Sequence, residues 1–328
     1  MLNILGITDN WVPCQHLCFG MAVSNLPTYL KANVVMKDIQ QKDKLFELEN
    51  KNEVDFVLFE PGMVGYPGIT TKLLRSHFPK AKLLAFATDT NYVKAHNCGF
   101  QLDSPQDCDL YCEHMELTLD WMKEKGVSTD YWQITGSELL FHHLLRQPKA
   151  DKVYDFIGVY HPIAFNDPNN YRTRMRSFLQ EKGYTFTQGE GEGHYDNANT
   201  ENLFSNYAKS WFTLGTSSHN DPLQHRGSKG FRDWVGPFCH SLLIYDDYPD
   251  VIKHRWPCPI YKFGDFEHIT RIADWWKANP GYIEVKLKEQ QAWAMANSIE
   301  KQIVQLMLKH KFVDQKDLYE NAYIYFNR

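Results

Sequence analysis

The sequence predicts an α/β protein made of two Rossmann-like domains that face a cleft. The first observation is that short apolar, strand-like runs alternate with helical stretches, as in parallel sheets covered on both faces. The second is that this alternation restarts after the polar, proline-marked stretch QPKADKV at 147–153. The third is length, because 328 residues can form two ordinary domains, each with its own core.

The first half contains five strand-like runs. We expect helices over 40–50, 68–78 and 115–126, the last of them ended by Gly126 as a C-cap. TDNWVPCQHLCFG, which follows the first run, is expected to be a loop. The runs are LNILGIT (2–8), NVVMKD (33–38), VDFVLFE (54–60), KLLAFATD (82–89) and CDLYCEH (108–114).

The linker places the domains at 1–150 and 151–328, and the last helices of the second domain could pack back on the first. In the second half we expect helices over 169–183, 201–210 and 266–279 and one long final helix near 283–310. Its strand-like runs are YDFIGVY (154–160), YTFTQGEG (184–191), WFTLGTSS (211–218), HSLLIYDD (240–247) and CPIYKF (258–263).

Composition limits the classes of protein that fit. Apolar residues make up 43% and charged residues 23%, which is typical of a globular protein rather than a disordered one. Seven cysteines without CxxC spacing argue against a disulfide framework. The net charge of −5 means that any nucleic-acid contact would need a local basic patch. No run is long enough to span a bilayer and the start does not resemble a signal peptide, so we expect a cytoplasmic protein.

The segment QHRGSKGFRDWVGPFCHSLLIYDD at 224–247 carries the chemistry of the second half. A basic, glycine-broken loop leads into a short amphipathic helix and then into a strand that ends on aspartates. Glycines allow backbone N–H groups to approach an anion, and a helix N-terminus favours one. A lone basic Gly/Ser loop is more often a solvated turn, so the hypothesis of a phosphate cradle depends on its context.

That context resembles a GT-B glycosyltransferase, and residues 154–310 look like the CgeB-like, group 1 family. FIGVYHP, YRTRMRSFL and YTFTQGEGEG match one ordered run of that family, and the segment at 224–247 matches a later one. The family usually has a Glu after the aromatic residue of the helix and a Gly before the LL strand. This chain has Arg232 and Asp233 after Phe231, and His240 near the glycine position.

The resemblance implies a glycosyltransferase that takes its sugar from a nucleoside-diphosphate sugar, a UDP-sugar by expectation, with no other cofactor. Arg226 and Lys229 would neutralise the diphosphate, and a carboxylate such as Asp246 would accept hydrogen bonds from sugar hydroxyls. We expect metal-independent transfer, since no HxH, HExxH or DxD pattern supports a metal site. The expected donor-binding residues are Gly158, His161, Arg172, Gly189, Gly191, Arg226, Lys229, Gly230, Asp233 and Asp246.

The first domain would receive the acceptor. Asp9 and His16 follow its first strand, and Asp89 follows its fourth, where an acceptor hydroxyl would arrive. An inverting transfer needs a general base there, and His or Asp can serve, although capping or turn formation is the commoner explanation for any one of these residues alone. The acceptor could be a glycan, a small molecule or a hydroxymethylated DNA base.

Two other classes of function remain open at this stage. A nucleotide-sugar epimerase shares the two-domain fold and acts on the donor alone. A catalytically inactive nucleotide-sugar-binding module is compatible with the missing family Glu. A dinucleotide oxidoreductase is disfavoured, because TDNWVPCQ follows the first strand in place of GxGxxG.

Overall fold

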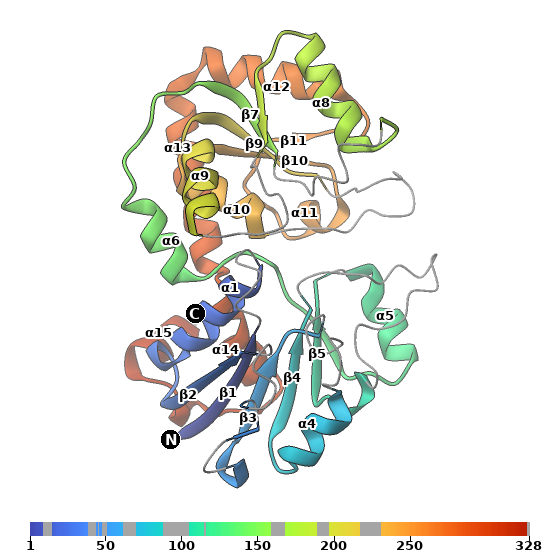
Figure 1. The fold of residues 1–328 in the computed structure, drawn as a ribbon, viewed down its shortest axis with the longest axis vertical. Coiled ribbons are helices and arrows are strands. Elements are labelled where there is room, and N and C mark those ends of the chain that lie inside the picture. Colours follow the sequence, from blue (N-terminus) through green and yellow to red (C-terminus); the bar gives the residue numbers. More distant parts are fainter. Residues whose placement is uncertain are drawn as a thin grey trace. The chain divides into compact units, whose positions relative to one another are not determined.

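A computed structural model of the chain divides into two compact units (Figure 1). Unit 1 comprises residues 1–139 and 297–328, and unit 2 comprises residues 140–296. The structure describes residues 1–8, 15–38, 44, 46–47, 51–61, 70–87, 105–114, 116–158, 168–188, 197–216 and 231–326.

Unit 1 is built on one sheet of six strands, all parallel, in the order β2-β1-β3-β4-β5-β6. Strands β1 and β3 are neighbours although β2 lies between them in the chain, so the direction of winding reverses between these two strands. The five strand-like runs of the first half are confirmed. The strands are β1 (Leu2–Thr8), β2 (Ala32–Asp38), β3 (Phe56–Phe59), β4 (Lys82–Phe86), β5 (Leu110–Glu113) and β6 (Thr129–Tyr131).

The helices of unit 1 include one that the sequence reading missed. Residues 15–25 form helix α1, whereas the sequence predicts a loop for TDNWVPCQHLCFG, which overlaps the start of this helix. The expected helices at 68–78 and 115–126 are confirmed, and Gly126 has φ 75°, the left-handed C-cap conformation that glycine favours. The helices are α1 (Gln15–Asn25), α4 (Thr71–His77), α5 (Glu116–Glu124), α14 (Ile299–Lys309) and α15 (Glu320–Phe326), with single 3-10 turns at Leu26–Thr28, Lys51–Glu53, Pro105–Asp107 and Gln315–Asp317.

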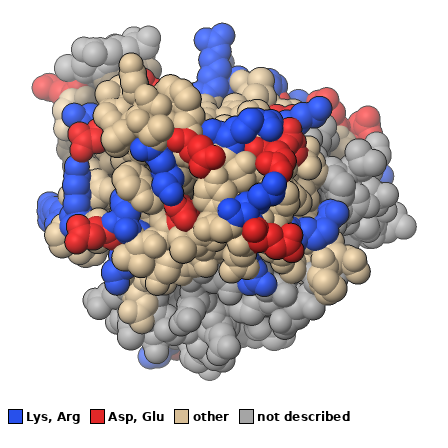
Figure 2. All heavy atoms as spheres, turned by 90° about the horizontal axis from the view of Figure 1, so that it is seen from above, with Lys and Arg blue, Asp and Glu red and all other residues tan. Residues whose placement is uncertain are grey.

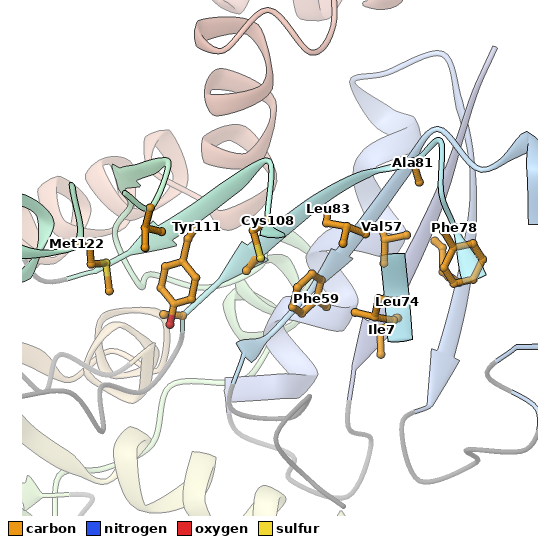
Figure 3. Close-up of a cluster of buried hydrophobic side chains, with 14 residues drawn as sticks. Ile7, Val57, Phe59, Leu74, Phe78, Ala81, Leu83, Cys108, Tyr111 and Met122 are labelled. Atoms are coloured by element: carbon orange, nitrogen blue, oxygen red, sulfur yellow. The ribbon is translucent and has the colours of Figure 1, made fainter. Parts of the chain in front are cut away.

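One face of this sheet buries a continuous apolar cluster (Figure 3). Val57 and Phe59 of β3 meet Leu83 of β4 and Tyr111 of β5, while Leu74 packs on them from α4. Alternate residues of each strand reach the same face, which is why β1, β3, β4 and β5 can share one core. Burial of this face fixes the strand register, and with it the positions of the residues that follow each strand.

Unit 2 has a sheet of five parallel strands in the order β11-β10-β9-β7-β8. Here the winding reverses between β7 and β9. All five strand-like runs of the second half are confirmed as strands within the described residues. The strands are β7 (Tyr154–Gly158), β8 (Phe186–Gln188), β9 (Ser210–Leu214), β10 (Leu242–Asp246) and β11 (Ile260–Tyr261).

The helices of unit 2 lie on both sides of its sheet (Figure 1). The expected helix at 169–183 is α8, and Gly183 ends it with φ 88°. Phe141 of α6 stacks on Phe238 of α10, with ring centroids 3.9 Å apart. The helices are α6 (Glu138–Leu145), which spans the boundary between units, α8 (Tyr171–Glu181), α9 (Asn197–Ala208), α10 (Phe231–Phe238), α11 (Pro249–Lys253), α12 (Phe266–Ala278) and α13 (Pro280–Ala296).

The chain passes between units at two places, after Leu139 and after Ala296. It enters unit 2 at residues 139–140, within α6 and before the polar linker at 147–153. The single long helix expected near 283–310 is wrong, because α13 ends at Ala296 and α14 begins at Ile299. Thr135 donates to the carbonyl of Asn297, and the amide of Ile299 donates to the carbonyl of Gly136, so unit 1 binds the backbone at the break.

The charged side chains are mixed in sign on the face that Figure 2 shows. Lysine and arginine alternate there with aspartate and glutamate, and the described residues of that face form no broad area of one sign. Within the described part of the chain, no helix has the length and apolar character needed to cross a membrane.

Candidate functional site

The carboxyl edge of the unit 2 sheet gathers polar residues from three elements. In open parallel sheets, ligands bind beyond the carboxyl ends of the strands where the winding reverses, which in unit 2 is between β7 and β9. After β7 the chain leads to α8, and after β9 it leads to α10 (Figure 1). The first turns of these two helices therefore belong to the site.

Arg172 is held in the first turn of α8. The side chain of Asn170 caps this helix by accepting a 2.9 Å hydrogen bond from the amide of Arg172. Only 6% of Arg172 is exposed, and it belongs to the electrostatic surroundings of Tyr245 on β10. A buried guanidinium near this edge provides a fixed positive charge.

Gly215, which follows β9, allows Tyr245 of β10 and Asp233 of α10 to approach the end of that strand. A Cβ atom at this position would lie 2.3 Å from Cδ2 of Tyr245 and 3.4 Å from Cγ of Asp233. The first distance is impossible for real atoms, so only glycine fits against the Tyr245 ring. The carbonyl of Gly215 accepts a 3.0 Å hydrogen bond from the hydroxyl of Tyr261. Gly215 thereby brings Asp233, in the first turn of α10, close to the end of β9.

Tyr245 and two carboxylates form the centre of the edge. Burial, then the charges of Asp233 and Asp246, raise the pKa of Tyr245 well above its usual value, while Arg172 acts in the opposite direction. A hydrogen bond to Asp233 adds to the rise, so the phenol stays neutral. Asp246 is fully buried and accepts a 3.0 Å hydrogen bond from the hydroxyl of Thr216. Asp233 is only half-buried, which leaves its carboxylate the more accessible of the two.

Packed aromatic rings hold α10 in place behind this group. Trp234 is fully buried and stacks on Trp293 of α13, with ring centroids 4.6 Å apart. Trp256 contacts both Trp234, at 4.9 Å, and Tyr245, at 5.1 Å. The helix also lies very close to β9, because a Cβ on Gly236 would be 2.0 Å from Oγ1 of Thr213. This support fixes the direction in which Asp233 leaves the helix.

The structure therefore brings together three of the expected donor-binding residues, Arg172, Asp233 and Asp246. Gly158 ends β7, paired with Gln188 of β8, at the same carboxyl edge. The other expected donor-binding residues lie outside the described residues: His161, Gly189, Gly191, Arg226, Lys229 and Gly230.

The corresponding edge of unit 1 carries polar residues that the sequence reading overlooked. Thr8 ends β1 and Glu60 follows β3, so these two buried residues flank the point where the winding reverses. Glu113 ends β5 and His114 follows it, each with 1% exposure. Glu60, Glu113 and His114 are the polar ends of the runs VDFVLFE and CDLYCEH, whose apolar pattern predicts strands but does not indicate that the polar ends are buried.

The expected catalytic residues of unit 1 are only partly placed. His16 belongs to the first turn of α1, and its side chain is not described. Asp9 directly follows Thr8, and Asp89 comes shortly after Ala87; both aspartates are outside the described residues. The described His, Cys, Asp and Glu side chains include no group of three arranged to hold a metal ion.

Comparisons with known proteins define the fold. No family model matches the sequence, and no curated protein matches it. Among solved structures, an α-glucosyltransferase in complex with UDP and a 13-mer DNA has a TM-score of 0.62 at 8% identity, covering 95% of this chain and 99% of that one. A trehalose-6-phosphate synthase from E. coli bound with UDP-2-fluoro glucose has a TM-score of 0.58 at 10% identity, covering 95% and 99%. A sucrose-phosphate synthase from Thermosynechococcus elongatus has a TM-score of 0.55 at 11% identity, covering 94% and 99%.

These similar structures are GT-B glycosyltransferases, and the match extends over nearly the whole length of each chain. Both units have the parallel, doubly wound sheet of a Rossmann-like domain. The expected fold class is confirmed: the chain is an α/β protein with the two Rossmann-like domains of the GT-B fold.

Proposed function

We propose that this protein is a glycosyltransferase that moves a sugar from a nucleoside-diphosphate sugar to an acceptor hydroxyl. The observation that carries the proposal is the group Arg172, Asp233, Tyr245 and Asp246 at the carboxyl edge of unit 2, on a fold shared with UDP-sugar enzymes. A fold alone does not determine function, so the site has to supply the argument.

The donor fits the chemistry of this edge. A nucleotide-sugar has two anionic phosphates and many hydroxyl groups, and it needs cationic donors at one end and acceptors at the other. Arg172 is a buried cation, and the half-buried carboxylate of Asp233 can accept hydrogen bonds from ribose or sugar hydroxyls. We propose that Arg226 and Lys229, in the chain between β9 and α10, complete the phosphate site. UDP is the expected nucleotide, since UDP or a UDP-sugar is bound in two of the similar structures.

Unit 1 is proposed to receive the acceptor. The similar structures point to two acceptor chemistries, since one is a complex with DNA and others are named for sugar phosphates. A glycan, a small molecule and a hydroxymethylated DNA base are the candidates. The mixed charge of the face in Figure 2 means that a DNA acceptor would have to contact another face.

Three finer features belong to the same proposal. The resemblance of residues 154–310 to the CgeB-like family supports a group 1 enzyme, either a hexosyl- or a pentosyltransferase. Metal-independent transfer is proposed because cationic side chains can neutralise the leaving diphosphate. A cytoplasmic location agrees with the free, buried thiols of Cys112, Cys239 and Cys258.

A panel of UDP-sugars tests the function directly. Purified protein is incubated with each donor, alone and with hydroxymethylated DNA, glucose 6-phosphate or an oligosaccharide, and both UDP release and acceptor mass are measured. Transfer shows as UDP release together with an acceptor that gains one sugar. Conversion of the donor without UDP release would indicate the epimerase, and binding without turnover the inactive module.

A matched pair of variants links that activity to the site. Asp233→Asn keeps the size of the side chain but removes its charge, so we expect weaker donor binding and a loss of kcat/KM on the order of 10-fold or more. Asp274→Asn, on α12 and away from this edge, serves as the control. Equal activity of the two variants would contradict the proposed donor site.

A further inference from the structure

We propose that His114 is the residue of unit 1 that accepts the proton of the acceptor hydroxyl, and that Glu113 is its positioning residue. This inference rests on the proposed glycosyl transfer and names the group that performs one step of it. His114 was not among the catalytic candidates that the sequence suggested, which were Asp9, His16 and Asp89.

The burial of His114 is the first observation. Only 1% of the residue is exposed, yet neither ring nitrogen makes a hydrogen bond to any described residue. A buried polar group without a partner is destabilising, so native proteins seldom retain one without a reason. A reactant that brings a hydroxyl group to Nε2 would supply the missing hydrogen bond.

The contact with Glu113 is the second observation. Nδ1 of His114 lies 3.0 Å from Oε1 of Glu113, within ion-pair range although not aligned as a hydrogen bond. The same oxygen accepts a 2.7 Å hydrogen bond from the backbone amide of His114. A carboxylate beside Nδ1 favours the proton on that nitrogen, which leaves the lone pair on Nε2. This is the arrangement by which a carboxylate orients a histidine base, and such contacts commonly tighten only when substrate is bound.

The frame around the pair is rigid. Trp132 donates its backbone amide to the carbonyl of Glu113 at 3.0 Å and its indole N–H to the carbonyl of Ala87 at 2.9 Å. The backbone amide of Ala87 donates in turn to the carbonyl of Cys112 at 2.9 Å. The ends of β4 and β5 are thus fastened together at the carboxyl edge, where ligands of open α/β sheets bind.

The other titratable groups of the neighbouring strands do not compete for this role. Burial raises the pKa of Tyr111 and of Cys112 well above their usual values, so both remain protonated. Asp130 of β6 is opposite Cys112 and already pairs with Lys309 at 2.6 Å and with His310 at 2.8 Å. Although burial opposes it, hydrogen bonds from Lys309 and His310 hold the pKa of Asp130 below its usual value.

In the proposed step, the sugar moves to the acceptor oxygen and the acceptor proton moves to His114. The acceptor oxygen forms a bond to the anomeric carbon, and the bond from that carbon to the diphosphate oxygen breaks. The bonding electrons leave with UDP, and the acceptor proton moves to Nε2 of His114, from which it later passes to solvent. Glu113 stabilises the imidazolium that forms.

Kinetics on three variants test the proposal, with UDP-glucose as donor and the acceptor found in the panel. His114→Ala should lower kcat on the order of 10²-fold or more, leave the Kd for UDP-glucose within about twofold, and recover activity with added imidazole. Glu113→Gln should cause a smaller loss and move the ascending limb of the kcat/KM profile to lower pH, because the imidazolium loses its carboxylate. His310→Ala is the matched control, since it removes a histidine that lies 2.8 Å from a carboxylate elsewhere in unit 1.

The outcomes separate this inference from the proposed function. If wild-type protein transfers glucose and His114→Ala keeps its full kcat, the role of His114 is refuted while the function stands. If His114→Ala loses activity that imidazole does not restore, and Glu113→Gln leaves the pH profile in place, the pair is only structural. If wild-type protein binds UDP-glucose and transfers it to no acceptor, both proposals fail.

Discussion

Glu300 should make the stability of unit 1 decrease as the pH rises toward neutrality. Its side chain is fully buried at the start of α14. Oε1 accepts hydrogen bonds from the hydroxyl of Ser137 at 2.6 Å, the amide of Glu138 at 3.0 Å and the side chain of Asn25 at 3.3 Å. Oε2 is also buried and has no hydrogen-bond partner among the described residues.

A second carboxylate, that of Glu138, further raises the pKa of Glu300. Glu138 accepts a hydrogen bond from Tyr29 at 2.5 Å and pairs with Lys301 at 2.6 Å. Its charge nevertheless opposes ionisation of Glu300. Burial, the largest influence, and this like charge raise the pKa of Glu300 to about 7, although hydrogen bonds to Ser137 and Asn25 act against them.

The direction and size of the effect follow from the two pKa values. The unfolded carboxyl has its ordinary pKa of 4.5, and the folded one about 7. Between these values the folded state holds a proton that the unfolded state releases, so stability is fully present below the lower value and is lost as pH rises through the higher one. Roughly 2.5 pKa units at about 1.4 kcal/mol each amount to about 3 kcal/mol.

Replacing Glu300 with Gln should remove this dependence. The amide oxygen can keep the three hydrogen bonds of Oε1, and the amide has no charge to bury. Relative to wild type, Glu300→Gln should gain about 3 kcal/mol of unfolding free energy between pH 4.5 and pH 8. Urea unfolding at several pH values, followed by hydrogen exchange of β1 and β3 peptides, reports unit 1 specifically.

An exposed glutamate provides the control. Glu124→Gln at the end of α5 changes the same chemical group at an exposed position and should follow the wild-type curve at every pH. If the curves of wild type and Glu300→Gln run parallel from pH 4.5 to pH 8, Glu300 is ionised in the folded protein and the reasoning is wrong.

Four further substitutions test unit 2. Gly215→Ala should lower donor affinity at least tenfold, measured by titration calorimetry with UDP, because the new Cβ would lie 2.3 Å from the Tyr245 ring and must displace it. Arg226→Ala and Lys229→Ala should each lower kcat/KM on the order of 10²-fold with an unchanged melting temperature, and near wild-type turnover would mean that the donor phosphates bind elsewhere. His240→Gly should raise the unfolding free energy by about 0.5–1 kcal/mol in urea titrations, since His240 has φ 63°; a loss of stability would show that its side-chain packing outweighs this relief.

Most strands were predictable from the sequence because they are short apolar runs of a sheet covered on both faces. Strand β6 was not, since Thr129–Tyr131 is a polar, half-buried tripeptide at the edge of the unit 1 sheet. Helix α1 was not, since Gln15–Asn25 lacks an acidic first turn and a basic last turn and has little separation of polar from apolar residues. The break between α13 and α14 was also missed; its backbone is bound by Thr135 and Gly136, which are distant in the chain. Contacts between residues far apart in the chain are not visible in a local pattern.

The donor edge was easier to predict than the acceptor edge for a related reason. Arg172, Asp233 and Asp246 occur in segments where glycines and charges mark the ends of elements, and the structure brings them together. Glu113 and His114 end an ordinary apolar run, and nothing in CDLYCEH distinguishes a buried pair from a solvated one. Trp132, which follows β6, binds the backbone of Glu113 and of Ala87, and this contact is not visible in the run itself.

The two ends of α10 are physically connected. His240 follows the helix with φ 63°, the left-handed conformation for which glycine is usual. Fixing the end of the helix also fixes its start, because Trp234 and Gly236 are packed against Trp293 and Thr213. Asp233 then leaves the first turn toward Gly215 and Tyr245, and its shorter side chain reaches them because Gly215 has no Cβ. A Glu at this position would extend one methylene further, so the length of the Asp233 side chain and the close packing at Gly215 depend on each other.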